Sequence, residues 1–200
     1  MLLLNLASPG QAQEPVTVVA LGDSLTAGYG LAAQEGFVAQ LQAWLDAEGA
    51  AVEVRQAGVS GDTTAGGLAR LDWALGEDAD AVIVALGGND FLRGVEPSES
   101  EANLRGILER TEARGLPVLL VGINASGQYG ADFEAAFDGM YRTLAAEFDA
   151  LLEPDWFEAL RGVPLGEVMQ SDGIHPNAQG VARIVERLGP RVLELTERAG

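Results

Sequence analysis

The chain has 200 residues, a formal net charge of −18, and a sequence that is 48% hydrophobic. That length suits one domain with a single core, and the apolar content excludes a disordered chain. All twelve basic residues are arginine, and so acidic a chain repels nucleic acid and anionic membrane surfaces. The absence of cysteine excludes disulfides and thiolate chemistry, and a single histidine makes a usual zinc site improbable. No pattern indicates an obligate protein partner.

The first thirteen residues differ in character from the rest. Residues 2–7 are mostly apolar, and small residues follow at 8–12, as at the cleavage end of a secretory signal peptide. No positive charge precedes the apolar run, which is also short, so this interpretation requires a start upstream of Met1. We expect residues 1–13 to be a signal-peptide remnant or else a disordered tail. The first alternative predicts a periplasmic or secreted protein, and the second leaves a cytoplasmic location open.

Short apolar runs alternate with amphipathic stretches along the remaining chain. The pattern predicts five strands, at 16–21, 52–55, 81–86, 118–123 and 151–152. A helix follows each strand in the same order, at 36–48, 64–75, 98–114, 131–148 and 177–198. Ser98 and Glu101 form a capping-box pattern at the start of the third helix. No stretch reaches the 18 apolar residues of a membrane span, so no stable membrane insertion is expected.

This alternation predicts an α/β fold, with a parallel sheet covered on both faces, in one domain over residues 14–200. Ligands bind such sheets beyond the carboxyl ends of the strands. The connections after the strands look short or rich in glycine. We therefore expect a surface cleft without a lid.

The tetrapeptide Gly-Asp-Ser-Leu at 22–25 follows the first predicted strand directly. A serine at such a turn exposes its hydroxyl, and its own backbone N–H can point toward a developing oxyanion. Ser24 is therefore a candidate nucleophile, although a helix N-cap serine is the common alternative. The pattern is not the Gly-x-Ser-x-Gly elbow, because Thr26 replaces the last glycine.

Glycine-rich clusters follow the second and third strands. Gly61, in the run 58–63, has a backbone N–H that can serve as an oxyanion donor. The alternative is a plain turn in which Asp62 caps the next helix. Asn89, in the run 87–90, carries an amide that can stabilise negative charge, although Gly-Gly-Asn-Asp also suits an ordinary turn.

The last cluster precedes the final helix and contains the only histidine in the chain. Asp172 lies three residues before His175, with a glycine between them that permits a sharp bend. A carboxylate at this spacing can accept a hydrogen bond from the histidine Nδ1–H and fix its tautomer. Nε2 is then free to act as a general base toward a serine.

Together and in this order, the four clusters resemble the sequence blocks of the SGNH (GDSL-type) hydrolase superfamily, with Ser24, Gly61, Asn89 and His175 at its four namesake positions. Three stretches further resemble the bacterial arylesterases and the thioesterase I/lysophospholipase L1 subgroup: 21–29, 60–63 and 89–94. The similarity extends from Val16 to the last helix. The sequence departs from the subgroup at Gln56 and in the loop 124–130, which lacks a proline-containing pattern and is expected to border the acyl pocket.

The resemblance implies a flavodoxin-like three-layer α/β/α fold with strand order 2-1-3-4-5, and neither cofactor nor metal. It implies a triad of Ser24, His175 and Asp172, with an oxyanion hole formed by the Ser24 and Gly61 N–H groups and the Asn89 side chain. The expected activity is hydrolysis of short-to-medium acyl esters and thioesters, on small-molecule substrates, through an acyl-enzyme. Two alternatives remain open: a carbohydrate O-deacetylase on the same triad, and a non-catalytic flavodoxin-like binding domain.

Overall fold

A five-stranded sheet lies at the centre of residues 14–199, the part of the chain described by the computed structural model. Its strands are β1 (Val16–Gly22), β2 (Val52–Gly58), β3 (Ala81–Ala85), β4 (Val118–Val121) and β5 (Leu151–Glu153). They pair in parallel in the order β2-β1-β3-β4-β5. The predicted topology is therefore confirmed. The expected signal remnant or tail at 1–13 lies outside the described residues.

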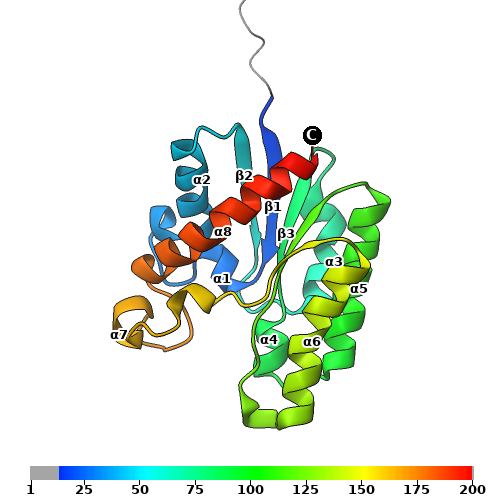
Figure 1. Ribbon diagram of the computed structural model, residues 1–200, viewed down its shortest axis with the longest axis vertical. Coiled ribbons are helices and arrows are strands. Elements are labelled where there is room, and N and C mark those ends of the chain that lie inside the picture. The colour runs from blue at the N-terminus through cyan, green and yellow to red at the C-terminus, as the bar shows by residue number, and fades with distance from the viewer. Residues whose placement is uncertain (1–13, 200) are drawn as a thin grey trace, which may run out of the picture.

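Helices cover both faces of this sheet (Figure 1). Because side chains alternate along a strand, Val18 and Ala20 share one core while Val19 and Leu21 share the other. The first core is closed by α2 (Phe37–Ala47) and α8 (Ala178–Ala199), and the second by α3 (Thr64–Leu75), α5 (Pro97–Ala113) and α6 (Ala131–Glu147). The predicted three layers are confirmed. None of the helices within 14–199 is both long and apolar enough to cross a membrane.

The start of α5 differs from the prediction. Glu96 is the N-cap residue, Pro97 occupies the first turn, and no side chain caps the helix. The expected capping box at Ser98 and Glu101 is therefore wrong. Proline fixes φ at a helical value and has no N–H to satisfy, so it begins the helix one residue earlier.

Short elements absent from the prediction occupy the connections: α1 (Ser24–Ala27), α4 (Gly88–Leu92), α7 (Leu165–Val168), and the 3₁₀ turns η1 (Ala33–Glu35), η2 (Gly127–Tyr129) and η3 (Glu158–Leu160). The segment between β5 and α8 is long, and it contains both η3 and α7. The expectation that the connections after the strands are short or rich in glycine is wrong there. Helices of one turn leave too little periodicity in a sequence to be recognised.

Asn177 joins this segment to the final helix. Its side-chain oxygen accepts hydrogen bonds from the Gln179 and Gly180 N–H groups at 3.0 Å, and its amide donates to the Glu167 carbonyl at 2.9 Å. The first turn of α8 is thus capped by a residue that also holds α7. The turn that carries His175 lies between these two helices.

Because α8 packs closely against α7, we expect a side chain at Gly180 to destabilise the protein. Alanine normally stabilises a helix relative to glycine by about 1 kcal/mol. A Cβ at Gly180, however, would lie 2.1 Å from the Val168 carbonyl oxygen, a backbone atom that cannot rotate away. Gly180→Ala should therefore lower the free energy of unfolding by about 1–3 kcal/mol in urea titrations.

Gly139 in α6 provides the matched control, because nothing lies within 4 Å of a Cβ built there. Gly139→Ala should raise the free energy of unfolding by about 0.5–1 kcal/mol. Equal stabilisation by both substitutions would show that α8 does not pack against Val168 as described.

Candidate active site

Ser24 is the first residue of α1, immediately beyond the carboxyl end of β1. The N-cap of this helix is Asp23, whose Oδ1 accepts a hydrogen bond from the Leu25 N–H at 3.0 Å. The alternative of Ser24 as the N-cap residue is therefore wrong. Since its side chain is not used for capping, the Ser24 hydroxyl is available to line the pocket.

His175 and Asp172 are held in one tight turn after α7. Asp172 Oδ1 accepts hydrogen bonds from the Ile174 and His175 N–H groups at 2.9 and 3.0 Å. Gly173, between them, has a φ of +67°, a left-handed conformation that favours glycine. Asp172 Oδ2 lies 2.7 Å from His175 Nδ1. One carboxylate thus fixes both the turn and the imidazole.

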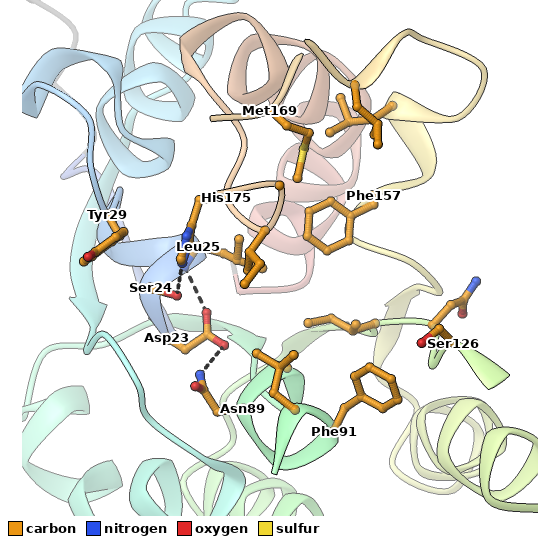
Figure 2. A pocket seen from close by; sticks show the side chains of 18 of the residues that line it. Asp23, Ser24, Leu25, Tyr29, Asn89, Phe91, Ser126, Phe157, Met169 and His175 are labelled. Carbon is orange, nitrogen blue, oxygen red and sulfur yellow. Dashed lines mark hydrogen bonds between the residues drawn. The ribbon is translucent and has the colours of Figure 1, made fainter. Parts of the chain in front are cut away.

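The turn brings His175 to Ser24 across 151 residues of sequence. The distance from His175 Nε2 to Ser24 Oγ is 2.9 Å, and Figure 2 shows the two side chains facing one another. Hydrogen bonds from the His175 backbone and side chain, and from the Ile174 backbone, lower the pKa of Asp172 to about 2. Asp172 therefore remains an acceptor over the whole physiological pH range.

Gly61 and Asn89 line the same pocket as Ser24 and His175. Gly61, with a φ of +81°, lies in the loop between β2 and α3, and Asn89 lies in the first turn of α4.

The Asp90 carboxylate, next to Asn89, is buried and accepts hydrogen bonds from the Thr64 N–H and hydroxyl at 2.9 and 2.6 Å. This pair joins α4 to the start of α3. The alternative of Asp62 as a helix cap is wrong, since Thr63 is the N-cap residue of α3.

Asp23 also lines the pocket, although no sequence pattern indicated a role for it. The residue is 2% exposed, and its Oδ2 accepts a hydrogen bond from Asn89 Nδ2 at 3.1 Å (Figure 2). Burial raises the pKa of Asp23 to about 6, although the hydrogen bonds from Leu25 and Asn89 oppose that shift. The Asn89 amide has two N–H donors, so one remains for a ligand.

The pocket has a volume of about 690 Å³ and mostly apolar walls. Figure 2 shows Phe157 and Met169, from the segment after β5, on one side and Phe91 on the other. Tyr29 lies at the histidine, with 4.7 Å between the ring centroids. Asn124 and Ser126 also line the pocket, as expected for the loop 124–130.

The wall formed after β5 could not be predicted from the sequence, because its apolar residues are spread over turns and two short helical elements. The only signal was their number in a region without a predicted element: Phe157, Leu160, Val163, Leu165 and Met169. Within residues 14–199, no group of three or more His, Asp or Glu side chains is arranged to hold a metal ion.

The arrangement of serine, histidine and carboxylate beside candidate oxyanion donors agrees with comparisons to known proteins. Residues 20–183 match the GDSL-like Lipase/Acylhydrolase family. The chain belongs to this family. Its relatives include Esterase TesA of Pseudomonas aeruginosa, 41% identical over 180 residues that cover 90% of this chain and 89% of the relative. Thioesterase 1/protease 1/lysophospholipase L1 of Escherichia coli K12 is 41% identical over 162 residues, which cover 80% of this chain and 76% of the relative.

Solved structures of the family agree. The SGNH-hydrolase family esterase AlinE4 is similar with a TM-score of 0.77 and 41% identity, over 92% of this chain and 98% of that one. The resemblance found in the sequence is therefore confirmed, as are the fold class and the prediction of a carboxylic ester hydrolase.

The buried Asp23 carboxylate should make the free energy of unfolding of this protein depend on pH. Its folded pKa of about 6 exceeds the ordinary value of 3.8, so the folded protein binds more protons between these pH values. Stability is therefore lost as pH rises through this window, by about 3 kcal/mol for such a shift. Asp23→Asn removes this loss. The free energy of unfolding of the variant should therefore rise relative to that of the wild type as the pH is raised from 4 to 7.

Asp72→Asn is the matched control, because the Asp72 side chain is 76% exposed and its ion pair with Arg110, at 3.7 Å, is open to water. It should leave the pH dependence of stability unchanged. A difference between Asp23→Asn and the wild type that is constant from pH 4 to pH 7 would contradict the raised pKa of Asp23.

Proposed function

We propose that this chain is a serine esterase that hydrolyses short-to-medium acyl esters and thioesters through an acyl-enzyme on Ser24. The observation that carries the proposal is the connected set of hydrogen bonds from Ser24 Oγ to His175 Nε2 and from His175 Nδ1 to Asp172. These two hydrogen bonds are 2.9 and 2.7 Å long. Both lengths lie within the hydrogen-bonding range required between a nucleophile and its base, and between the base and the group that orients it.

In the first half-reaction, Ser24 Oγ bonds to the substrate carbonyl carbon while its proton passes to His175 Nε2. The carbonyl oxygen becomes an oxyanion, and we assign its stabilisation to the Ser24 N–H, the Gly61 N–H and the Asn89 amide. Collapse of the tetrahedral intermediate breaks the bond to the leaving alcohol or thiol, which takes the proton from His175. The acyl group remains on Ser24.

In the second half-reaction, water repeats the attack on the acyl-enzyme carbonyl. His175 takes a proton from this water and returns it to Ser24 Oγ as the acid departs. Asp172 stays ionised throughout and stabilises the imidazolium that forms at each attack, without accepting its proton. Every proton is thus transferred by residues already present, and no step requires a metal or cofactor.

The apolar walls support an acyl substrate rather than an acetylated carbohydrate. A sugar would leave hydroxyl groups against the Phe91, Phe157 and Met169 side chains, and the few polar side chains of the wall, such as Asn124 and Ser126, cannot pair with all of them. An acyl chain instead gains about 0.8 kcal/mol for each methylene that it buries. Because the oxyanion hole contacts only the carbonyl, esters and thioesters with good leaving groups should both react.

A series of p-nitrophenyl esters of rising acyl length tests this function. We expect kcat/KM to rise over the first few carbons and then to level off when the chain outgrows the pocket. Acyl thioesters should also be hydrolysed, without activation at a lipid–water interface. Ser24→Ala should lower kcat by about 10³-fold or more while the protein stays folded.

The same measurements separate the alternatives. If the protein removes acetyl groups only from a polysaccharide and hydrolyses no aryl ester, it is a carbohydrate O-deacetylase and the proposed function is wrong. Retention of activity by Ser24→Ala would reject the assigned nucleophile. No turnover of any ester by folded protein would favour a binding domain.

We also propose export to the periplasm or the cell exterior, supported by the apolar run at 2–7 and the small residues at 8–12. On this proposal the mature protein begins near Gln13. N-terminal sequencing of natively expressed protein should recover that residue, whereas recovery of Met1 would contradict export.

A further inference from the structure

One arginine on α3, Arg70, contacts three separate segments near the candidate active site. Its Nε donates to Asp62 Oδ2 at 2.7 Å, its Nη1 to the Ala57 carbonyl at 2.8 Å, and its Nη2 to the Gly22 carbonyl at 2.9 Å. Its side chain is only 18% exposed. A guanidinium is planar and rigid, so these three acceptors are held in a fixed relation to one another.

The three acceptors lie on the chain segments that lead to the oxyanion donors. Gly22 is the last residue of β1, two residues before Ser24. Ala57 lies near the end of β2, where it pairs with Leu21 of β1. Asp62 directly follows Gly61. The Arg70 guanidinium therefore connects the chain that carries the Ser24 N–H to the loop that carries the Gly61 N–H.

Other hydrogen bonds also hold the loop that contains Gly61. The Val59 N–H donates to the Gly22 carbonyl and the Asp62 N–H to the Val59 carbonyl, both at 3.0 Å. Arg93 donates to the Gly61 carbonyl at 2.8 Å from an exposed position. The Asp62 side chain, by contrast, is only 11% exposed where it meets Arg70. Charge-assisted hydrogen bonds shielded from water are stronger than exposed ones, so the contact with Arg70 is the firmer of the two arginine contacts.

We propose that Arg70 is a positioning residue for the oxyanion hole: its guanidinium sets the separation between the Ser24 and Gly61 N–H groups. This inference rests on the proposed function, in which both groups bind the oxyanion. Such donors act only within about 2.7–3.1 Å of the oxygen. A displacement near 1 Å can cost about 10²-fold in rate, even though Arg70 itself does not touch the substrate.

Arg70→Lys tests the proposal, because lysine keeps the charge but cannot reproduce a planar fork with three fixed donors. We expect kcat on a p-nitrophenyl ester to fall by about 10- to 100-fold with little change in KM. Affinity for phenylboronic acid, which forms a tetrahedral adduct on a serine, should fall with kcat/KM. A purely structural arginine would lower the unfolding temperature and leave both quantities unchanged in folded protein.

Arg55→Lys is the matched control. Arg55 also donates to a carboxylate, that of Asp78 at 3.0 and 2.6 Å, and to a carbonyl of α3, that of Leu75 at 3.4 Å. These contacts lie at the carboxyl end of α3, away from the pocket residues. Arg55→Lys should therefore leave kcat, KM and the affinity for phenylboronic acid unchanged.

Asp62→Ala supplies a second variant should Arg70→Lys fail to fold. It releases the Gly61 loop but leaves the Arg70 contacts to Gly22 and Ala57, so kcat should fall by about 10-fold. Wild-type kcat and phenylboronic acid affinity in a folded Arg70→Lys or Asp62→Ala protein would overturn the positioning role. Ser24→Ala, assayed in parallel, separates this outcome from failure of the proposed function: an active Ser24→Ala rejects the triad itself.

Discussion

The hydrogen bond between His175 Nε2 and Ser24 Oγ constrains the whole active site, because it joins the end of β1 to a turn that follows β5. Such a contact requires both segments to reach the same edge of the sheet, which parallel strands with helical crossovers provide. It also requires the long segment after β5 to return across that edge. In doing so, this segment carries Phe157 and Met169 to the pocket, so the contact that builds the candidate triad also builds an apolar wall.

Two aspartates near Ser24 show how the surroundings of a carboxylate determine its chemistry. Asp172 accepts two backbone N–H groups beside His175, and its pKa falls to about 2. Asp23 is buried with fewer donors, and its pKa rises to about 6. The exposed carboxylate therefore remains charged beside the imidazole at any working pH. The buried one costs stability at neutral pH while it orients the Asn89 amide, a cost typical of functional positions.

The continuous apolar runs of the strands were sufficient to predict a parallel sheet and the convergence of Ser24, Gly61, Asn89 and His175 at one edge of it. The strand order came from the resemblance to the SGNH superfamily instead. The sequence was insufficient for α1, α4 and α7, which are too short to show a helical period. The Arg70 contacts were equally hidden, since its three acceptors lie 8 to 48 residues away and two of them are backbone carbonyls. Pairings of that kind depend on the folded chain rather than on any local motif.

The most direct test of the proposed catalytic centre is a crystal structure of the protein after reaction with an alkyl fluorophosphonate. We expect phosphorus bonded to Ser24 Oγ, with one phosphonate oxygen within about 3.1 Å of the Ser24 nitrogen, the Gly61 nitrogen and Asn89 Nδ2. The alkyl group should extend between Phe91 and Phe157. Phosphorus on another side chain, or an oxygen that contacts neither Gly61 nor Asn89, would contradict the account.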